Sequence, residues 1–206
     1  MACGTWYSSA PEVDLLVRHL QRAGLNDISL SVPAGQTLCI HGPSGSGKSL
    51  LLRAIADLDP NQGQVSLGGI RRESVPAPQW RGLVSYLPPE SHWWQEQVRA
   101  HASDWNLATL EGLGFAADVL DWPVSRLSTG ERQRLSIARS LARTPRAMLL
   151  DEPTANLDPG NTLVVEQVLS NYQQETRAPM LWVSHDPAQR ERVALLAREI
   201  IDGILQ

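Results

Sequence analysis

The stretch Gly42-Pro43-Ser44-Gly45-Ser46-Gly47-Lys48-Ser49 matches the phosphate-loop template G-x-x-x-x-G-K-[ST] at every fixed position. The preceding residues, 36–41, contain the apolar run Leu38-Cys39-Ile40 and predict a short buried strand. The following residues, 50–57, are rich in leucine and alanine and predict a helix. Because a strand, a glycine-rich turn and a helix form the context in which this template binds phosphate, the sequence predicts a nucleotide site here.

Each residue type in this stretch has a physical role. Glycines let successive backbone N–H groups face a phosphate oxygen, and the helix that begins near Gly47 directs its positive end there. Lys48 adds a positive charge for the outer phosphates, and the Ser49 hydroxyl suits Mg²⁺. A glycine-rich turn that only caps a helix is the simpler alternative, but it does not require Lys48 and Ser49. The predicted nucleotide-binding residues of this stretch are Gly42, Pro43, Ser44, Gly45, Ser46, Gly47, Lys48, Ser49 and Leu50.

The composition excludes several classes of protein. The chain has 206 residues and a net charge of −4 without a long basic run, which disfavours a dedicated nucleic-acid binder. Its two cysteines, Cys3 and Cys39, are too few for a disulfide framework. No apolar run approaches the ~20 residues that span a bilayer, and the first residues do not resemble a secretion signal. We therefore expect one cytoplasmic domain over residues 1–206, with residues 1–10 as a loose N-terminal arm.

The periodicity of the chain predicts an α/β fold. Strands are expected at residues 13–17, 28–32, 65–67, 83–87, 147–150 and 180–183. Helices are expected at residues 129–143 and from Pro159 onward. Residues 91 to about 128 hold four of the seven tryptophans and mixed helical patterning, which predicts a small helical subdomain inserted into the core. The fold class is thus a phosphate-loop NTPase: a mostly parallel sheet, an antiparallel β part and ligands at the carboxyl ends of the strands.

Two carboxylates, Asp151 and Glu152, follow the apolar run at 147–150. A hard Mg²⁺ ion prefers oxygen ligands, so Asp151 and Ser49 are the predicted metal ligands. Glu152 is then suited to accept a proton from the water that attacks the terminal phosphate. The plainer alternative is an Asp-Glu-Pro turn that only ends a strand.

Residues 127–134, LSTGERQR, form the next informative stretch. Ser128 and Glu131 have the spacing of a capping box, in which each side chain satisfies the other's backbone N–H. Capping explains the serine and the glutamate, but it does not require Gly130. Because a glycine-containing helix start is also an anion site, we predict that Ser128, Thr129, Gly130 and Glu131 contact nucleotide.

In their order, the phosphate loop, LSTGERQR, MLLDEP, ANLD and VSHD resemble the ATP-binding cassette (ABC) ATPases over about residues 13–202. The resemblance implies a homodimer in which two copies stack head to tail around two ATP molecules with Mg²⁺. Each ATP would then lie between one phosphate loop and residues 128–130 of the other copy. Asp158 resembles the end of the loop that crosses the dimer interface. His185 resembles the histidine that contacts the γ-phosphate beside Glu152, and after a buried strand it is also placed to bond a phosphate oxygen and the attacking water.

Three features depart from the family pattern. Pro89 stands where a glutamine usually contacts Mg²⁺ and water, so either Glu90 replaces it, a backbone carbonyl does, or turnover is slow. Thr129 stands where a second glycine is common. No aromatic residue near positions 19–25 is placed to stack on adenine, which leaves His19, Arg22 or the Trp6-Tyr7 pair as substitutes.

The resemblance implies an ATPase subunit that powers transport through a separate membrane permease, at the inner face of the membrane. The GERQR form and the compact length resemble exporter and lipoprotein-release types, including small metal-export ATPases. The permease is expected to dock near residues 90–94, where either Trp93 or Trp94 is an exposed anchor or both rings are half buried. The alternatives are a soluble ABC ATPase without a transport role and an ATP-dependent interaction module of low turnover, which Pro89 supports.

Overall fold

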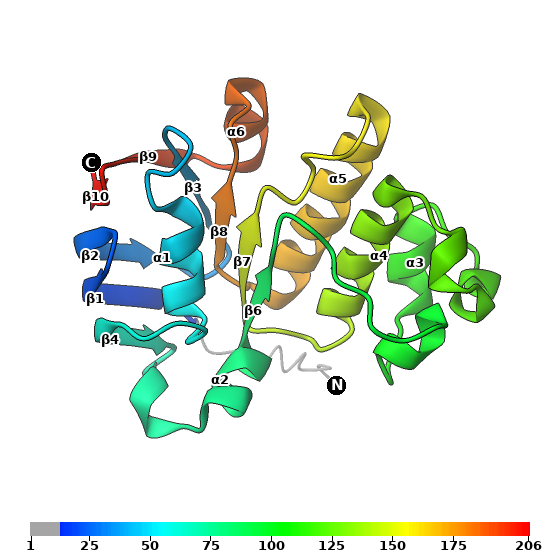
Figure 1. The fold of residues 1–206 in the computed structure, drawn as a ribbon, viewed down its shortest axis with the longest axis horizontal. Helices are drawn as coiled ribbons and strands as arrows, with labels where there is room; N and C mark the ends of the chain where they lie inside the picture. The colour runs from blue at the N-terminus through cyan, green and yellow to red at the C-terminus, as the bar shows by residue number, and fades with distance from the viewer. Residues whose placement is uncertain (1–12) are drawn as a thin grey trace, which may run out of the picture.

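The computed structural model describes residues 13–206 and arranges them as two sheets with helices between and around them (Figure 1). The larger sheet has six strands in the order β10-β9-β3-β8-β7-β6. Its strands from β9 to β6 pair in parallel, and only β10 runs antiparallel to its neighbour. The mostly parallel core is therefore confirmed. The strands are β3 (Thr37–His41), β6 (Val84–Leu87), β7 (Ala147–Asp151), β8 (Met180–Val183), β9 (Leu196–Ile201) and β10 (Ile204–Leu205).

The smaller sheet is antiparallel and has the order β2-β1-β4-β5. Its strands are β1 (Leu15–Arg22), β2 (Leu25–Val32), β4 (Gln62–Leu67) and β5 (Ile70–Arg71). The prediction for β1 was only partly right, because the strand begins later than residue 13 and continues past residue 17. His19 has a positive φ of 51°, and the pairing shifts on both sides of Leu20. Such an irregularity breaks the alternation from which a strand is recognised in a sequence.

Helices cover both faces of the larger sheet (Figure 1). Helix α1 (Lys48–Ile55) packs with both sheets on one side, while α4 (Thr129–Leu141) and α5 (Pro159–Thr176) cover the other side. Strand side chains alternate accordingly: Leu181 joins the cluster around α1, and its neighbours Met180 and Trp182 join the cluster around α4 and α5. Two shorter α-helices are α2 (Ala77–Leu83) and α6 (Pro187–Val193), and a 3-10 turn spans Arg72–Ser74. With both faces covered, the ends of the strands are left for ligands.

The tryptophan-rich segment contains short helices that lie beside α4 at one end of the molecule (Figure 1). They are the 3-10 helices η2 (Val98–His101), η3 (Ala117–Asp121) and η4 (Val124–Arg126), and α3 (Leu107–Gly112). Trp93 and Trp94 lie in the segment predicted as a helical subdomain, but residues 88–95 are irregular, so the helical part begins later than residue 91. The backbone N–H groups of Trp94 and Gln95 donate to Nε2 of His101 instead of to helical carbonyls. Trp94 is 65% exposed and Trp93 is partly buried, as one of the two alternatives predicted. The predicted arm at 1–10 lies outside the described residues.

Candidate nucleotide site

Three strands of the larger sheet end side by side. Asp151 at the end of β7 is in register with Val183 of β8, and the N–H of Glu152 donates to the Val183 carbonyl at 3.2 Å. The N–H of Ser184 donates to the carbonyl of Ile40 in β3 at 3.3 Å. The phosphate loop, the Asp151-Glu152 pair and His185 each follow one of these strands. The sheet therefore brings three distant parts of the sequence to one edge.

The phosphate loop has the backbone that its glycines predict. Gly47 adopts a left-handed conformation with φ 109° and is the N-cap of α1. At Gly42, with φ 137°, a Cβ atom would collide with the carbonyl oxygen of Ile200, so only glycine fits there. Gly45 instead faces open space. A pocket of about 250 Å³ lies over the loop and is lined by Ser44, Gly45, Gly47, Lys48, Ser49, Leu50, Glu152 and His185.

The donors around this pocket suit an anion. Ser46 belongs to the phosphate loop, and its buried Oγ has no hydrogen-bond partner among the described residues. The ammonium of Lys48 donates to the carbonyls of Gly42 and Pro43 at 2.9 and 2.8 Å. Burial lowers the pKa of Lys48, and the nearby charges of Glu152 and Asp151 partly oppose this shift. A triphosphate would add the negative charge that favours the ammonium form, so the loop fits such a ligand.

The predicted metal ligands also suit their role. Asp151 is 1% exposed, and the Tyr86 hydroxyl donates to its Oδ2 at 2.9 Å. Ser49 is the second residue of α1, on the loop side of the pocket. Within residues 13–206, no group of three or more histidine, cysteine or acidic side chains is close enough to enclose an ion. Mg²⁺ fits here because it keeps several waters and needs few protein oxygens.

Glu152 and His185 contact each other directly. The distance between His185 Nε2 and Glu152 Oε1 is 3.0 Å, and both side chains line the pocket over the phosphate loop. Glu152 has a positive φ of 48°, which is uncommon for a residue with a side chain. Strained backbone of this kind occurs often at functional sites. From this turn Glu152 lines the pocket, and its negative charge acts on Lys48 of the phosphate loop.

The predicted contacts of α4 lie outside this pocket. Ser128 is the N-cap of α4, and the capping box with Glu131 is present, as predicted. Glu131 Oε2 accepts from the N–H and the hydroxyl of Ser128 at 2.8 and 2.7 Å, and these bonds lower the pKa of Glu131. None of residues 128–131 lines the pocket over the phosphate loop of the same chain.

The loop before α5 lies next to this helix start. A Cβ atom on Gly130 would be 3.4 Å from Leu157 Cδ2 and 3.7 Å from the carbonyl oxygen of Asn156. Asp158 is exposed and caps α5 by accepting from the N–H of Asn161 at 2.9 Å. Residues 156–158 and the start of α4 therefore form one continuous surface.

Two side chains proposed as substitutes for an adenine-stacking aromatic already have partners. His19 Nδ1 lies 2.8 Å from Asp27 Oδ1, and the Arg22 guanidinium donates to Asp59 at 2.5 Å. The Trp6-Tyr7 pair lies outside the described residues.

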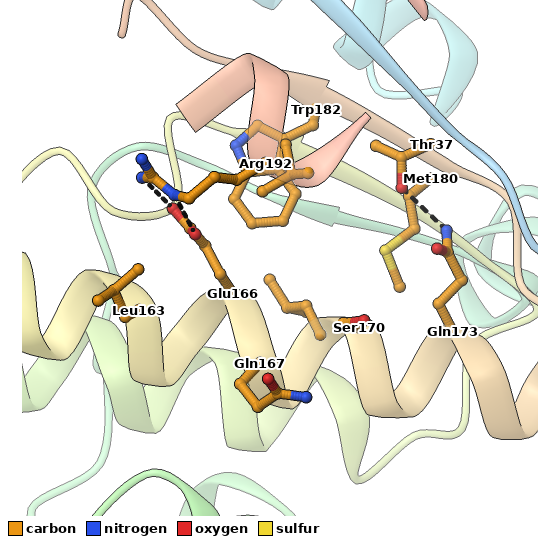
Figure 2. A pocket seen from close by; sticks show the side chains of 11 residues that line it. Thr37, Leu163, Glu166, Gln167, Ser170, Gln173, Met180, Trp182 and Arg192 are labelled. Carbon is orange, nitrogen blue, oxygen red and sulfur yellow. Dashed lines mark hydrogen bonds and ion pairs between the residues drawn. The ribbon is translucent and has the colours of Figure 1, made fainter. Parts of the chain in front are cut away.

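A polar network behind the site escaped the sequence analysis. Gln189 of α6 donates to Thr154 Oγ1 at 2.8 Å and to Glu166 Oε1 at 2.9 Å. Arg192 donates to both oxygens of Glu166, as Figure 2 shows beside a cavity of about 310 Å³. The network fixes α6, which follows His185, to the turn after Glu152. In the sequence, the one sign of this network is Glu166, a charged residue on the buried side of α5.

A phosphate loop, an acidic pair and a histidine at the carboxyl ends of a mostly parallel sheet define a phosphate-loop nucleoside triphosphatase. The model of the family described as "ABC transporter" matches residues 25–155. The chain therefore belongs to the ABC transporter family, and it is an ATP-binding and ATP-hydrolysing domain of that family.

Curated relatives extend this match over most of the chain. The chain is 35% identical to an aliphatic sulfonates import ATP-binding protein of Pseudomonas savastanoi, over 92% of this chain and 73% of the relative. It is 39% identical to an Fe(3+) ions import ATP-binding protein of Streptomyces avermitilis, over 90% of this chain and 57% of that relative. It is 34% identical to a phosphate import ATP-binding protein of Aeropyrum pernix, over 82% of this chain and 78% of that relative.

A solved structure supports the fold. A bacterial Atm1-family ABC exporter with ATP bound superposes with a TM-score of 0.81 and 20% identity, over 95% of this chain and 38% of the exporter chain. ATP-binding subunits of this family dimerise and work with membrane permease subunits. Among residues 13–206, none of the helices has the length and apolar character needed to cross a membrane.

Proposed function

We propose that two copies of this chain close head to tail around two ATP molecules and that Mg²⁺-dependent hydrolysis powers a separate membrane permease. One observation carries the proposal: Lys48, Glu152 and His185 share a pocket, whereas residues 128–130 of the same chain lie outside it. A second copy would complete the site, because its helix start can supply N–H donors over the open side of the pocket. Residues 156–158 lie beside that helix start and would cross the same interface.

In the proposed reaction, Glu152 accepts the proton of a water that attacks the terminal phosphorus. His185 holds the Glu152 carboxylate at 3.0 Å and would also donate to a terminal phosphate oxygen. Lys48 would leave the carbonyls of Gly42 and Pro43 to bind the outer phosphates. Ser49 and Asp151 would hold Mg²⁺, which neutralises charge on the outer phosphates when it is bound.

The permease is proposed to dock in a groove of about 430 Å³ beside the irregular segment 88–95. Its lining combines the exposed ring of Trp94 with the guanidinium groups of Arg81, Arg139 and Arg143. An aromatic anchor with cations around it fits a short helix that carries an apolar residue and acidic neighbours. Docking of a permease in this groove would hold the chain at the inner face of the membrane.

Uptake is the proposed direction of transport. The three relatives at 34–39% identity are all named as import proteins, for sulfonates, Fe(3+) and phosphate. The exporter likeness, at 20% identity, shows the fold alone. Export remains the expectation from the GERQR form of the sequence, and transport assays in vesicles of known orientation decide between the two directions.

Size-exclusion chromatography with ATP and Mg²⁺ tests the ATPase proposal. Glu152→Gln should accumulate as a dimer with ATP bound, since ATP binds and is not cleaved. Lys48→Ala should remain monomeric, because the loop loses its charge for the outer phosphates. A Glu152→Gln chain that binds ATP and stays monomeric would overturn the head-to-tail arrangement. Absence of ATP hydrolysis by the wild-type chain, even with its permease, would favour the interaction module instead.

The docking groove has its own test. The chain is co-expressed with the proposed membrane permease, and complex formation is measured by co-purification. Trp94→Ala should weaken the complex about tenfold or more, the usual effect of removing a central aromatic anchor. Leu107→Ala is the matched control, because Leu107 is 58% exposed but does not line the groove. Equal recovery of both variants would place the interface elsewhere.

A further inference from the structure

The strongest unassigned feature beside the site is a phenol that contacts a buried carboxylate. Tyr86 is in β6, which pairs in parallel with β7, and Asp151 is the last residue of β7. The Tyr86 hydroxyl donates to Asp151 Oδ2 at 2.9 Å. We infer that Tyr86 is a positioning residue that orients Asp151 for Mg²⁺. This inference rests on the proposed function.

Burial makes this hydrogen bond important for Asp151. With 1% of its surface exposed, the Asp151 carboxylate has almost no contact with solvent. A buried carboxylate without donors is costly, so its partners decide how it is oriented. Among residues 13–206, Tyr86 is the side chain that donates to Asp151. Since Tyr86 takes Oδ2, the carboxylate would present Oδ1 to an ion.

The direction of this hydrogen bond follows from the two groups. A carboxylate oxygen accepts, so the Tyr86 hydroxyl is the donor. The ring itself is held by the cluster around α1.

Tyr86 comes three residues before Pro89, the departure from the family pattern in the loop after β6. The loop after β6 carries Pro89, which has no side-chain oxygen for a metal or a water. Tyr86 approaches from the strand rather than from this loop, and it acts through Asp151. Partners of this kind fix the orientation of a ligand, and their loss commonly weakens metal binding about 10–100-fold.

The test measures binding rather than turnover. A non-hydrolysable ATP analogue is titrated into the full-length chain with Mg²⁺ and again with EDTA, and the ratio of the two affinities is the metal-dependent gain. Tyr86→Phe should keep the metal-free affinity and reduce this gain about tenfold or more. Binding of Mn²⁺ with the analogue, followed by electron paramagnetic resonance, should weaken in parallel.

Tyr172→Phe is the matched control. Tyr172 is also partly buried, its hydroxyl donates to the carbonyl of Pro145 at 2.6 Å, and it lies on α5 away from Asp151. This variant should keep the full metal-dependent gain. Because each gain compares one variant with and without metal, a general loss of stability cancels.

A double-mutant cycle with Asp151→Asn completes the test. Tyr86→Phe should have no additional effect on the gain once the Asp151 carboxylate is gone. An unchanged gain in Tyr86→Phe, or an equal loss with and without metal, would overturn the inference alone. If the wild-type chain bound no analogue at all, the proposed function would fall with it.

Discussion

His185 Nε2 lies 3.0 Å from Glu152 Oε1, and the two side chains come from turns after the neighbouring strands β8 and β7. Both residues line the pocket over the phosphate loop. The contact also gives the proposed general base a hydrogen-bonding partner, which is how a carboxylate is oriented toward a water. The first prediction follows from this pair.

Replacing His185 with alanine should reduce the turnover number for ATP about 100-fold, because Glu152 loses its partner and the terminal phosphate loses a donor. The metal-free affinity for a non-hydrolysable analogue should stay within about threefold of the wild type, since Lys48 and the loop backbone remain. Steady-state hydrolysis and analogue titration measure the two effects. The control is His92→Ala, which changes an exposed histidine outside the pocket over the phosphate loop. Wild-type turnover in His185→Ala would remove this residue from the mechanism.

The network beside the cavity predicts a loss of stability. Glu166 is 9% exposed, and its carboxylate accepts from Gln189. It also accepts from Arg192, as Figure 2 shows. Glu166→Gln should lower the free energy of unfolding by about 2 kcal/mol, because Arg192 loses a charged acceptor. Urea denaturation measures this change. Glu175→Gln, on the exposed side of the same helix, should change it by less than about 0.5 kcal/mol. Equal stabilities would show that the network does not hold α6.

Asp59 predicts a dependence of stability on pH. Hydrogen bonds from Arg53 and then from Arg22 hold the pKa of its carboxyl well below the usual value of 3.8. Because the folded pKa is the lower one, this stabilisation is fully present above about pH 4 and is lost as the pH falls further.

The wild-type chain should therefore exceed Asp59→Asn by about 2 kcal/mol in free energy of unfolding at pH 7, and the difference should shrink below pH ~4. Denaturation series at several pH values measure it. Asp104→Asn, an exposed control, should show no such trend. A difference that stayed constant down to pH ~2 would contradict the assignment.

His101 predicts a local change in dynamics. Its Nε2 accepts from the N–H groups of Trp94 and Gln95 at 3.0 and 2.9 Å, so Nδ1 carries the proton and donates to the Gln97 carbonyl. His101→Ala should speed hydrogen exchange at the Trp94 and Gln95 amides about fivefold or more, the effect of losing ~1 kcal/mol of local stability. Exchange measured by mass spectrometry checks this. The neighbouring exposed His92, changed to alanine, should leave these amides protected.

The sequence by itself determined the class of fold and the chemistry of the nucleotide site. The positive φ values of Gly42 and Gly47 favour glycine strongly, so the sequence of the loop indicates its backbone. The apolar runs at residues 38–40 and 147–150 predicted the buried strands that precede the loop and Glu152. These signals are local, because a turn or a strand leaves its pattern in adjacent residues. Where the local pattern is irregular, as in β1 and in the segment that holds Trp93 and Trp94, the prediction was poor.

Only the tertiary structure decided which distant side chains touch. Tyr86 reaches Asp151, and Gln189 joins Thr154 to Glu166, through contacts between elements far apart in the chain. Neither pair has a spacing that a sequence pattern reveals, because sheet register and helix packing set these distances. The absence of residues 128–130 from the phosphate pocket is likewise a property of the folded chain. These residues begin α4, which packs on the face of the larger sheet opposite α1.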